Sequence, residues 1–209
     1  SDLPLASSFT NFTRLSGTAA VAAFSAASKI HMLSEQVAVS FGTAMATYAG
    51  QNYGAGKAGR VREGLRKCAL ACEAITLGIM VIMTAFGGVM SSWFIDGYHP
   101  EVIQQAHLYL FISALFYPAL TMLFLYRNTL LGLGNGVTPM LAGVCELLSR
   151  MIGAPVLGHF FGFTGLCWIN PIAWVTASGL LFLSYRKTMR NIRPVDPTVD
   201  ASDPNKIMN

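Results

Sequence analysis

The polar stretch that decides the fold is Gly50-Gln51-Asn52-Tyr53-Gly54-Ala55-Gly56-Lys57-Ala58-Gly59-Arg60-Val61-Arg62. It is rich in glycine, it carries three cations and no acid, and long apolar runs lie on both sides of it. Lys and Arg accumulate in the cytoplasmic loops of membrane proteins. Once this stretch is assigned to one side of a membrane, every other segment acquires an orientation.

The apolar runs predict a membrane protein. The 209-residue chain is 53% hydrophobic and 11% charged, whereas soluble domains carry about 25% charged residues. Runs long enough to cross a bilayer, which takes about 20 mainly apolar residues, are 18–49, 68–94, 102–131, 137–161 and 165–185. They exceed the length of a barrel strand and do not alternate, so we predict an all-α integral membrane fold with these five runs as transmembrane helices.

The loop charges predict the orientation. The loop over residues 50–67 holds five cations and one acid, and residues 186–193 hold four more cations, whereas residues 95–101 hold acids but no Lys or Arg. With five crossings, the basic loop 50–67 and the C-terminal tail fall on the cytoplasmic side of the inner (plasma) membrane. Residues 1–190 are the predicted transmembrane lobe, and the Pro- and Asp-rich residues 191–209 are a predicted disordered cytoplasmic tail.

Charges inside the fourth run are the first candidate site. An ionisable group at mid-bilayer is costly and normally faces a partner or a wet cavity. Glu146 and Arg150 stand four residues apart and therefore share one helix face. They are either a proton- or cation-sensitive element in a cavity wall or a structural pair that joins helices.

A polar stripe on the first run is the second candidate. Ser28, His31 and Glu35 are spaced three and four apart, with Gln36 beside them. This face either lines a water-filled cavity or belongs to a helix that projects beyond the lipid. Arg127, near the end of the third run, is expected to extend to the lipid headgroups.

The sequence lacks the common catalytic motifs, and its other recurring features predict structural roles. The sequence has no zinc-protease, nucleophile-elbow or Walker motif, so no enzyme activity is expected. The Gly132–Gly136 segment joins two helices and is interpreted as a tight turn, not as a phosphate cradle.

Small residues at Gly42, Ala44 and Ala46 predict a close helix contact. Pro118 and Pro171 are candidate kinks. No metal site, bound cofactor or nucleic-acid partner is expected.

At this point the sequence resembles a known family. The blocks Gly17-Thr18-Ala19-Ala20-Val21-Ala22-Ala23-Phe24-Ser25-Ala26-Ala27-Ser28-Lys29-Ile30, Ser40-Phe41-Gly42, Gln51-Asn52-Tyr53-Gly54-Ala55-Gly56-Lys57 and Leu130-Leu131-Gly132-Leu133-Gly134-Asn135 with Thr138-Pro139 resemble, in order and spacing, the MATE family of multidrug and toxin extrusion antiporters. The DinF-like bacterial branch fits best. Within the loop, the signature residues are Gln51, Asn52, Gly54, Gly56 and Lys57.

The resemblance implies a fold, an activity and partners. The family has twelve helices in two pseudo-symmetric six-helix lobes, and this chain is similar to the C-terminal lobe, from the end of helix seven through helix twelve. The implied activity is export of organic cations or amphipathic drugs by alternating access, driven by Na⁺ or H⁺. The implied partners are the bilayer, the N-terminal lobe of the same transporter, and the drugs. The chain is therefore expected to be a fragment.

The departures from the family leave the site open. The third run holds no Asp or Glu between Val102 and Leu131, so the cation-coordinating acids of some members cannot be carried over. Glu35 and the Glu146–Arg150 pair are candidates from membrane energetics alone. Two alternatives remain: a flippase-like exporter of lipid-linked sugars from the same superfamily, and a small membrane subunit that does not transport.

Overall fold

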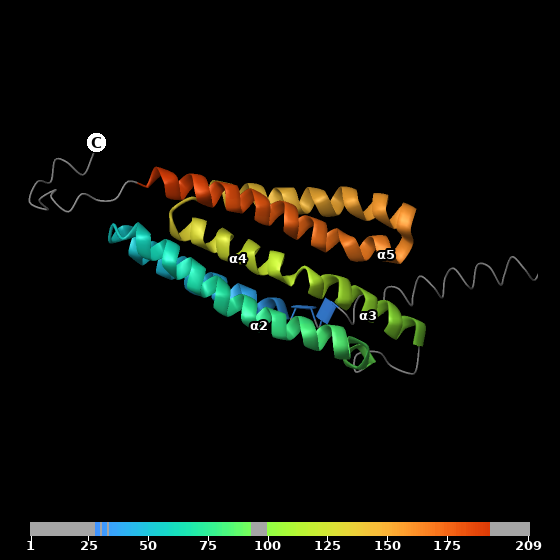
Figure 1. The fold of residues 1–209 in the computed structure, drawn as a ribbon. Coiled ribbons are helices and arrows are strands. Elements are labelled where there is room, and N and C mark those ends of the chain that lie inside the picture. The colour runs from blue at the N-terminus through green and yellow to red at the C-terminus, as the bar shows by residue number, and fades with distance from the viewer. Residues whose placement is uncertain (1–27, 30, 33, 93–99, 193–209) are drawn as a thin grey trace, which may run out of the picture.

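The computed structural model describes residues 28–29, 31–32, 34–92 and 100–192 (Figure 1). The start of the first predicted run and most of the predicted tail lie outside these residues. The residues that are described form helices and turns, without a strand among them. The predicted all-α class is therefore confirmed.

Five helical segments make up the described chain. Residues 34–54 are helical, as are the short described pieces just before them, and we call this segment the first helix. The others are α2 (Ala58–Ser92), α3 (Pro100–Leu115), α4 (Tyr117–Gly132) and α5 (Val137–Asn191). In Figure 1, α3 and α4 run through the middle, with α2 on one side and α5 on the other.

The predicted basic loop over 50–67 is a helix end, a tight turn and a helix start. Gly56 has a positive φ of 71°. The amide of Gly56 bonds to the carbonyl of Tyr53 at 2.9 Å, and the amide of Lys57 to that of Asn52 at 2.8 Å. This pair of bonds is the Schellman motif, which closes a helix on a left-handed residue. The second helix is predicted to start at residue 68, but α2 starts at Ala58. The basic residues over 60–67 lie on exposed turns of α2, which extend the helix before the apolar run.

The Gly132–Gly136 segment repeats this turn. Gly134 has φ 81°, its amide bonds to the carbonyl of Leu131 at 3.0 Å, and the amide of Asn135 bonds to that of Leu130 at 2.9 Å. The Asn135 side-chain oxygen then accepts the amide of Thr138 at 3.3 Å, at the start of α5. The predicted tight turn is confirmed. The two glycine-rich signatures have the same hydrogen-bond pattern around a glycine with positive φ.

The third predicted run is a bent helix at the centre of the lobe. It breaks at Phe116, and its two parts, Ile103–Leu115 and Tyr117–Gly132, meet at 53°. Pro118 lies in the first turn of α4, where a proline is tolerated because its missing N–H has no helical partner. The predicted kink at Pro118 is confirmed. Buried residues lie on all sides of α4, as expected for a central helix: Tyr117, Leu120, Thr121, Leu123, Leu125, Thr129 and Leu130.

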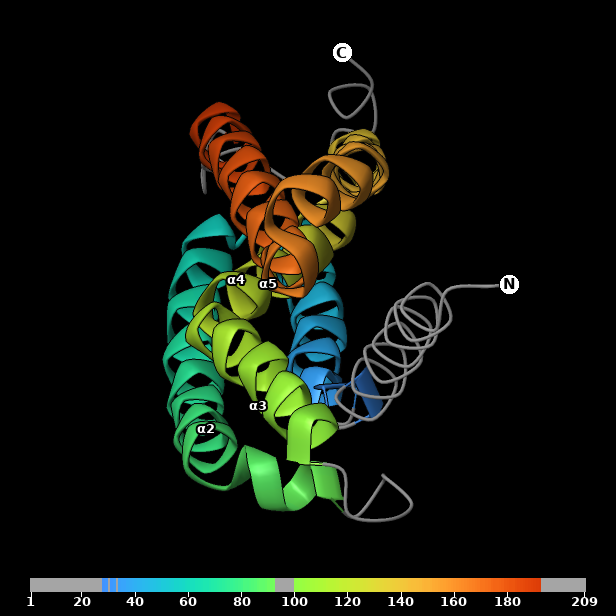
Figure 2. The ribbon, with the colours of Figure 1, turned by 90° about the vertical axis from the view of Figure 1, so that its right-hand side faces the viewer.

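The two last predicted runs are the arms of α5, which folds back on itself (Figures 1 and 2). The one non-helical residue inside α5 is Gly162, with φ 58° and ψ −139°. A Cβ on Gly165 would collide with the carbonyl of Leu157, so the arms touch backbone to backbone near the turn. The second arm continues to Asn191, beyond the predicted end at residue 185. Pro171 lies inside that arm without a break in the helix.

Small residues bring the first helix against α4. A Cβ on Gly42 would lie 2.6 Å from Nδ2 of Asn128, and a Cβ on Gly132 would collide with the carbonyl oxygen of Ala46. The predicted close contact therefore exists, and its partner is the end of α4. Ala44 is exposed and is not part of it.

The outer faces of the lobe are apolar. By length and composition, α2 over Ala58–Phe86 and α5 can each cross a membrane, and α3 with α4 forms a bent third candidate. Each arm of α5 also exceeds the roughly 20 residues that a crossing needs. Leu70, Val81 and Phe86 of α2 are 63%, 59% and 59% exposed. Such a surface fits lipid, which confirms a membrane protein.

Candidate functional site

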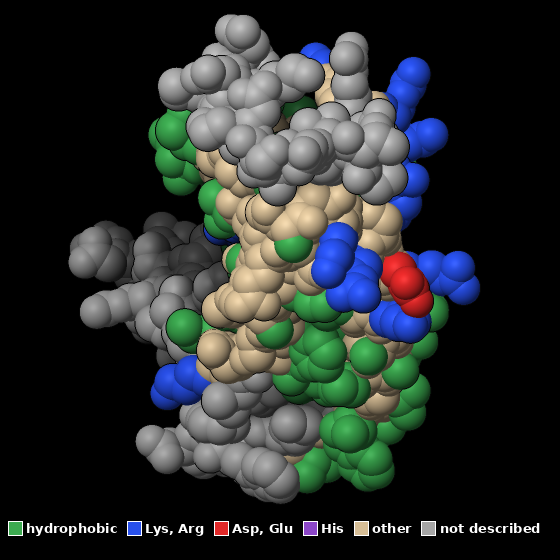
Figure 3. Space-filling model, turned by 90° about the vertical axis from the view of Figure 1, so that its left-hand side faces the viewer, with side chains coloured by type: hydrophobic (Ala, Val, Ile, Leu, Met, Phe, Trp, Pro, Cys, Tyr) green, Lys and Arg blue, Asp and Glu red, His purple; other side chains and the backbone are tan. Residues whose placement is uncertain are grey.

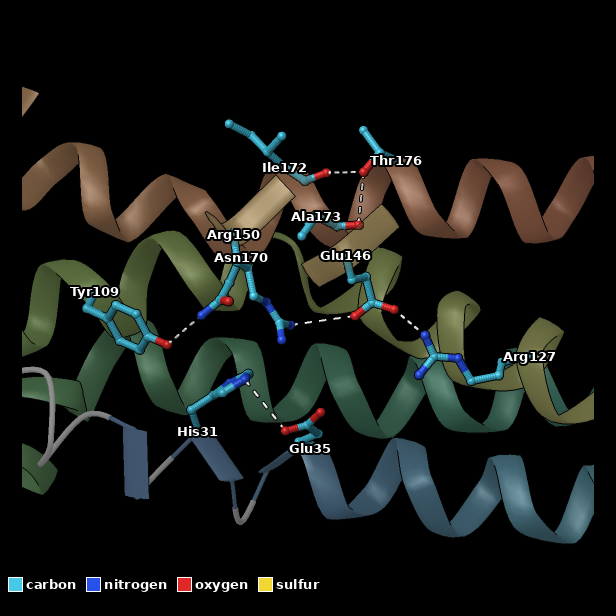
Figure 4. Close-up of polar contacts among 10 residues, drawn as sticks. All are labelled: His31, Glu35, Tyr109, Arg127, Glu146, Arg150, Asn170, Ile172, Ala173 and Thr176. Carbon is cyan, nitrogen blue, oxygen red and sulfur yellow. Dashed lines mark hydrogen bonds and ion pairs between the residues drawn. The ribbon is translucent and has the colours of Figure 1, made fainter. Parts of the chain in front are cut away.

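A buried carboxylate with two arginines lies between α4 and α5. Glu146 is 9% exposed. Arg127 of α4 forms an ion pair with one of its carboxylate oxygens, and Nη2 of Arg150 lies 3.6 Å from the other. The predicted Glu146–Arg150 pair is thus present, and Arg127 joins it as a third member (Figure 4).

Arg127 corrects the sequence-based expectation. The sequence predicts that Arg127 extends to the lipid headgroups, but its guanidinium turns inward to Glu146, and its side chain is 25% exposed. The physical reason is that a carboxylate buried with only a half-exposed partner is costly, and a second cation offsets that cost. The signal in the sequence was a surplus of one cation among the charges of the third and fourth runs.

His31 is packed in an aromatic box. Its ring is stacked on Tyr117 and on Trp174, with centroids 5.5 and 5.2 Å away, and Tyr109 meets it edge-on at 6.5 Å. Nδ1 of His31 is hydrogen-bonded with the hydroxyl of Tyr117 at 3.0 Å. At 7% exposure, His31 ties the first helix to the bend between α3 and α4.

The rest of the predicted stripe divides between core and surface. Nε2 of His31 lies 3.9 Å from Oε2 of Glu35, whose side chain is 31% exposed. Ser28 interacts through its side chain with Tyr109, and Gln36 is exposed. The stripe therefore leads from the aromatic box to the surface, with Glu35 at the border.

The structure brings the two predicted groups together. Glu35 interacts electrostatically with Arg150, Glu146 and Arg127, although more than 90 residues separate it from them in the chain. Figure 4 shows its carboxylate facing these side chains across the lobe. We call Glu35, Arg127, Glu146 and Arg150 the interior charge cluster. When ionised, its two acids balance its two cations.

One polar contact beside the cluster was missed from the sequence. Nδ2 of Asn170, on the second arm of α5, donates to the hydroxyl of Tyr109 on α3 at 3.0 Å. The available signal was an amide next to Pro171 in an apolar run, since a buried amide in lipid needs a partner. This bond holds the second arm of α5 against α3.

The loop signature lies elsewhere. Gln51, Asn52, Gly54, Gly56 and Lys57 form the end of the first helix and the turn after it. Glu35 precedes Gly54 by 19 residues, which is roughly 28 Å along a helix. The signature therefore shapes a turn and does not contribute to the interior charge cluster.

The cluster combines the carboxylates of Glu35 and Glu146 with the two arginines. A metal cation bound there would face two guanidinium groups. Among the described residues, no group of three or more His, Cys, Asp or Glu side chains could hold a metal ion.

Comparison with known proteins places the chain in a family. The family model of MatE matches residues 7–156, which include the first helix, the central bend and the first arm of α5 up to Val156. A search of curated proteins finds no match.

Proposed function

Because this chain belongs to the MATE family of transporters, we propose that it is part of a cation-coupled multidrug efflux antiporter. It would export organic cations or amphipathic drugs by alternating access, as a member of the DinF-like branch. The working protein would join this lobe to an N-terminal lobe, with the drug path between them. The carrying observation is the interior charge cluster, because ionisable groups grouped inside a membrane lobe are candidates for an ion pathway.

The composition of the cluster favours H⁺ over Na⁺ as the coupling ion. A proton neutralises Glu35 or Glu146 without needing a ligand cage. Na⁺ would need several oxygen ligands, and Arg127 and Arg150 repel it. Glu35 is the acid with the more exposed side chain, 31% against 11% for Glu146. We therefore assign Glu35 the role of exchanging protons with the drug path and Glu146 the role of holding the arginines.

Drug efflux tests the proposal. Cells that express the full gene are loaded with a fluorescent organic cation, and its export is followed with wild type, Glu35→Gln, Glu146→Gln and the control Glu63→Gln. Glu63 is an exposed acid on α2 that also has a cation four residues away. We expect export to fall to the level of cells without the gene for Glu35→Gln, and to stay unchanged for Glu63→Gln at equal membrane expression. Unchanged export with both Glu35→Gln and Glu146→Gln would remove the cluster from the mechanism.

Inverted membrane vesicles separate the coupling ions. We expect drug uptake under an imposed pH gradient without Na⁺, and none under a Na⁺ gradient with the proton gradient collapsed. Uptake under the Na⁺ gradient alone would overturn the assignment to H⁺ and leave the antiporter proposal intact.

The proposed orientation places the turn after the first helix and the end of α5 in the cytoplasm of the inner membrane. Lys57 is exposed in that turn. We expect a membrane-impermeant maleimide to label Lys57→Cys in inverted vesicles but not in intact cells. Labelling in intact cells would reverse the topology.

A further inference from the structure

One end of the lobe carries a dense positive surface that the transport proposal does not use. Its cations are all exposed, and only one acid, Glu63, occurs among residues 57–67 and 183–192. The cations come from the turn before α2, the first turns of α2 and the last turns of α5: Lys57, Arg60, Arg62, Arg66, Lys67, Arg186, Lys187 and Arg190. We call them the basic end, and Figure 3 shows Lys and Arg side chains gathered on this face.

The two stretches of the basic end meet in space. Nη2 of Arg62 on α2 donates to the carbonyl of Met189 on α5 at 3.4 Å. Beneath this contact Val61 and Met189 belong to the buried core. Cations more than 100 residues apart in the chain therefore form one surface.

Exposed apolar side chains adjoin these cations. Leu183, one turn before Lys187, is 66% exposed, and Leu70, one turn after Arg66, is 63% exposed. The guanidinium of Arg186 lies over the ring of Phe182, 5.7 Å from its centroid. The surface thus passes within one helical turn from positive charge to hydrocarbon, which is the profile of a membrane–water boundary.

We propose that the basic end binds the headgroup of an anionic phospholipid. The phosphate lies among the cations of α2 and α5, and an acyl chain runs along Leu183 or Leu70. Phosphate is the chemistry that several converging Arg side chains recognise. The adjoining apolar surface assigns the phosphate to a lipid, because a soluble anion would leave that surface unused. A lipid in this position also bridges α2 and α5, whose ends are joined by the Arg62 hydrogen bond. This proposal does not depend on drug transport.

Native mass spectrometry of the full chain in detergent tests it. The protein is titrated with phosphatidylglycerol or with phosphatidylcholine, and the fraction with bound lipid is recorded. We expect tighter retention of phosphatidylglycerol. Each cation near an anionic surface contributes about fivefold in affinity, so Arg186→Gln with Arg190→Gln weakens phosphatidylglycerol binding about 30-fold.

Two matched variants distinguish charge recognition from misfolding. Arg186→Lys with Arg190→Lys keeps the charge and is expected to bind within about threefold of wild type. Lys29→Gln removes an exposed cation about 25 residues before the end of the first helix, and should leave binding unchanged. Equal retention of the two lipids, or undiminished phosphatidylglycerol binding by the double Gln variant, overturns the proposal. Displacement of the lipid by millimolar inorganic phosphate would assign the site to a soluble anion and overturn it too.

Discussion

Glu63 on α2 and Glu146 on α5 each have a cation four residues later on the same helix, but their surroundings differ. The carboxylate of Glu63 lies 2.7 Å from Nζ of Lys67, with both side chains more than 60% exposed. The carboxylate of Glu146 lies 3.6 Å from Arg150, its side chain is 11% exposed, and Arg127 approaches it from another helix.

The contrast shows that spacing in the sequence determines which groups can form an ion pair, whereas burial determines how much that pair contributes to stability. Water screens the exposed pair, so its closer contact contributes little. The buried carboxylate has lost its hydration and depends on its partners. The following substitutions test this contrast, starting with the largest expected effect.

Arg127→Met should destabilise the lobe most. It removes the principal partner of Glu146 and leaves a buried carboxylate beside a half-exposed arginine, at a cost of about 3 kcal/mol. The free energy of unfolding, measured by denaturant titration in mixed micelles, checks this value. Adding Glu146→Leu to Arg127→Met removes the stranded charge and should recover most of the loss. No recovery would mean that Arg127 acts through packing and not through charge.

Arg150→Met should cost less than Arg127→Met. Its side chain is 46% exposed, so water can replace much of its interaction with Glu146, and we expect about 1 kcal/mol from the same titration. In drug export we expect the larger loss with Arg150→Met, because Arg150 is also the cation that acts most strongly on Glu35. Equal losses of stability for the two arginine variants would contradict the role of burial in the comparison.

The helices could be predicted from the sequence more fully than the pairing of their charges. Apolar runs indicate membrane helices, and the glycine-rich signatures indicate turns, because both depend on local chemistry. The apolar pattern predicts the start of α2 too late, since Arg60 to Lys67 are compatible with an exposed helix as well as with a loop. The partner of Glu146 could not be predicted. Arg127 reaches it through the packing of α4 against α5, and that packing depends on contacts distant in sequence.

Tyr117→Phe tests the neutral part of the same interior. It removes the hydroxyl that is hydrogen-bonded with Nδ1 of His31 while keeping the ring that stacks on the imidazole. We expect a loss of about 1 kcal/mol in the free energy of unfolding, with the bend at Phe116 retained. Trp174→Phe is the packing control. It keeps an aromatic ring against His31 and leaves the hydrogen bond between His31 and Tyr117 in place. A change below the error of the titration for Tyr117→Phe would show that the stacking alone holds His31.

Lys67→Met should have the smallest effect of the series. It breaks the closer of the two four-residue ion pairs, but both groups are exposed, so the unfolding midpoint should remain within error of wild type. Raising the salt concentration should also leave wild type and Lys67→Met indistinguishable, because screening removes what little the pair contributes. The same variant removes one cation of the basic end, and binding of phosphatidylglycerol should fall about fivefold. Lost stability together with unchanged lipid binding would overturn the comparison, since the charge of Lys67 would then serve the fold and not the surface.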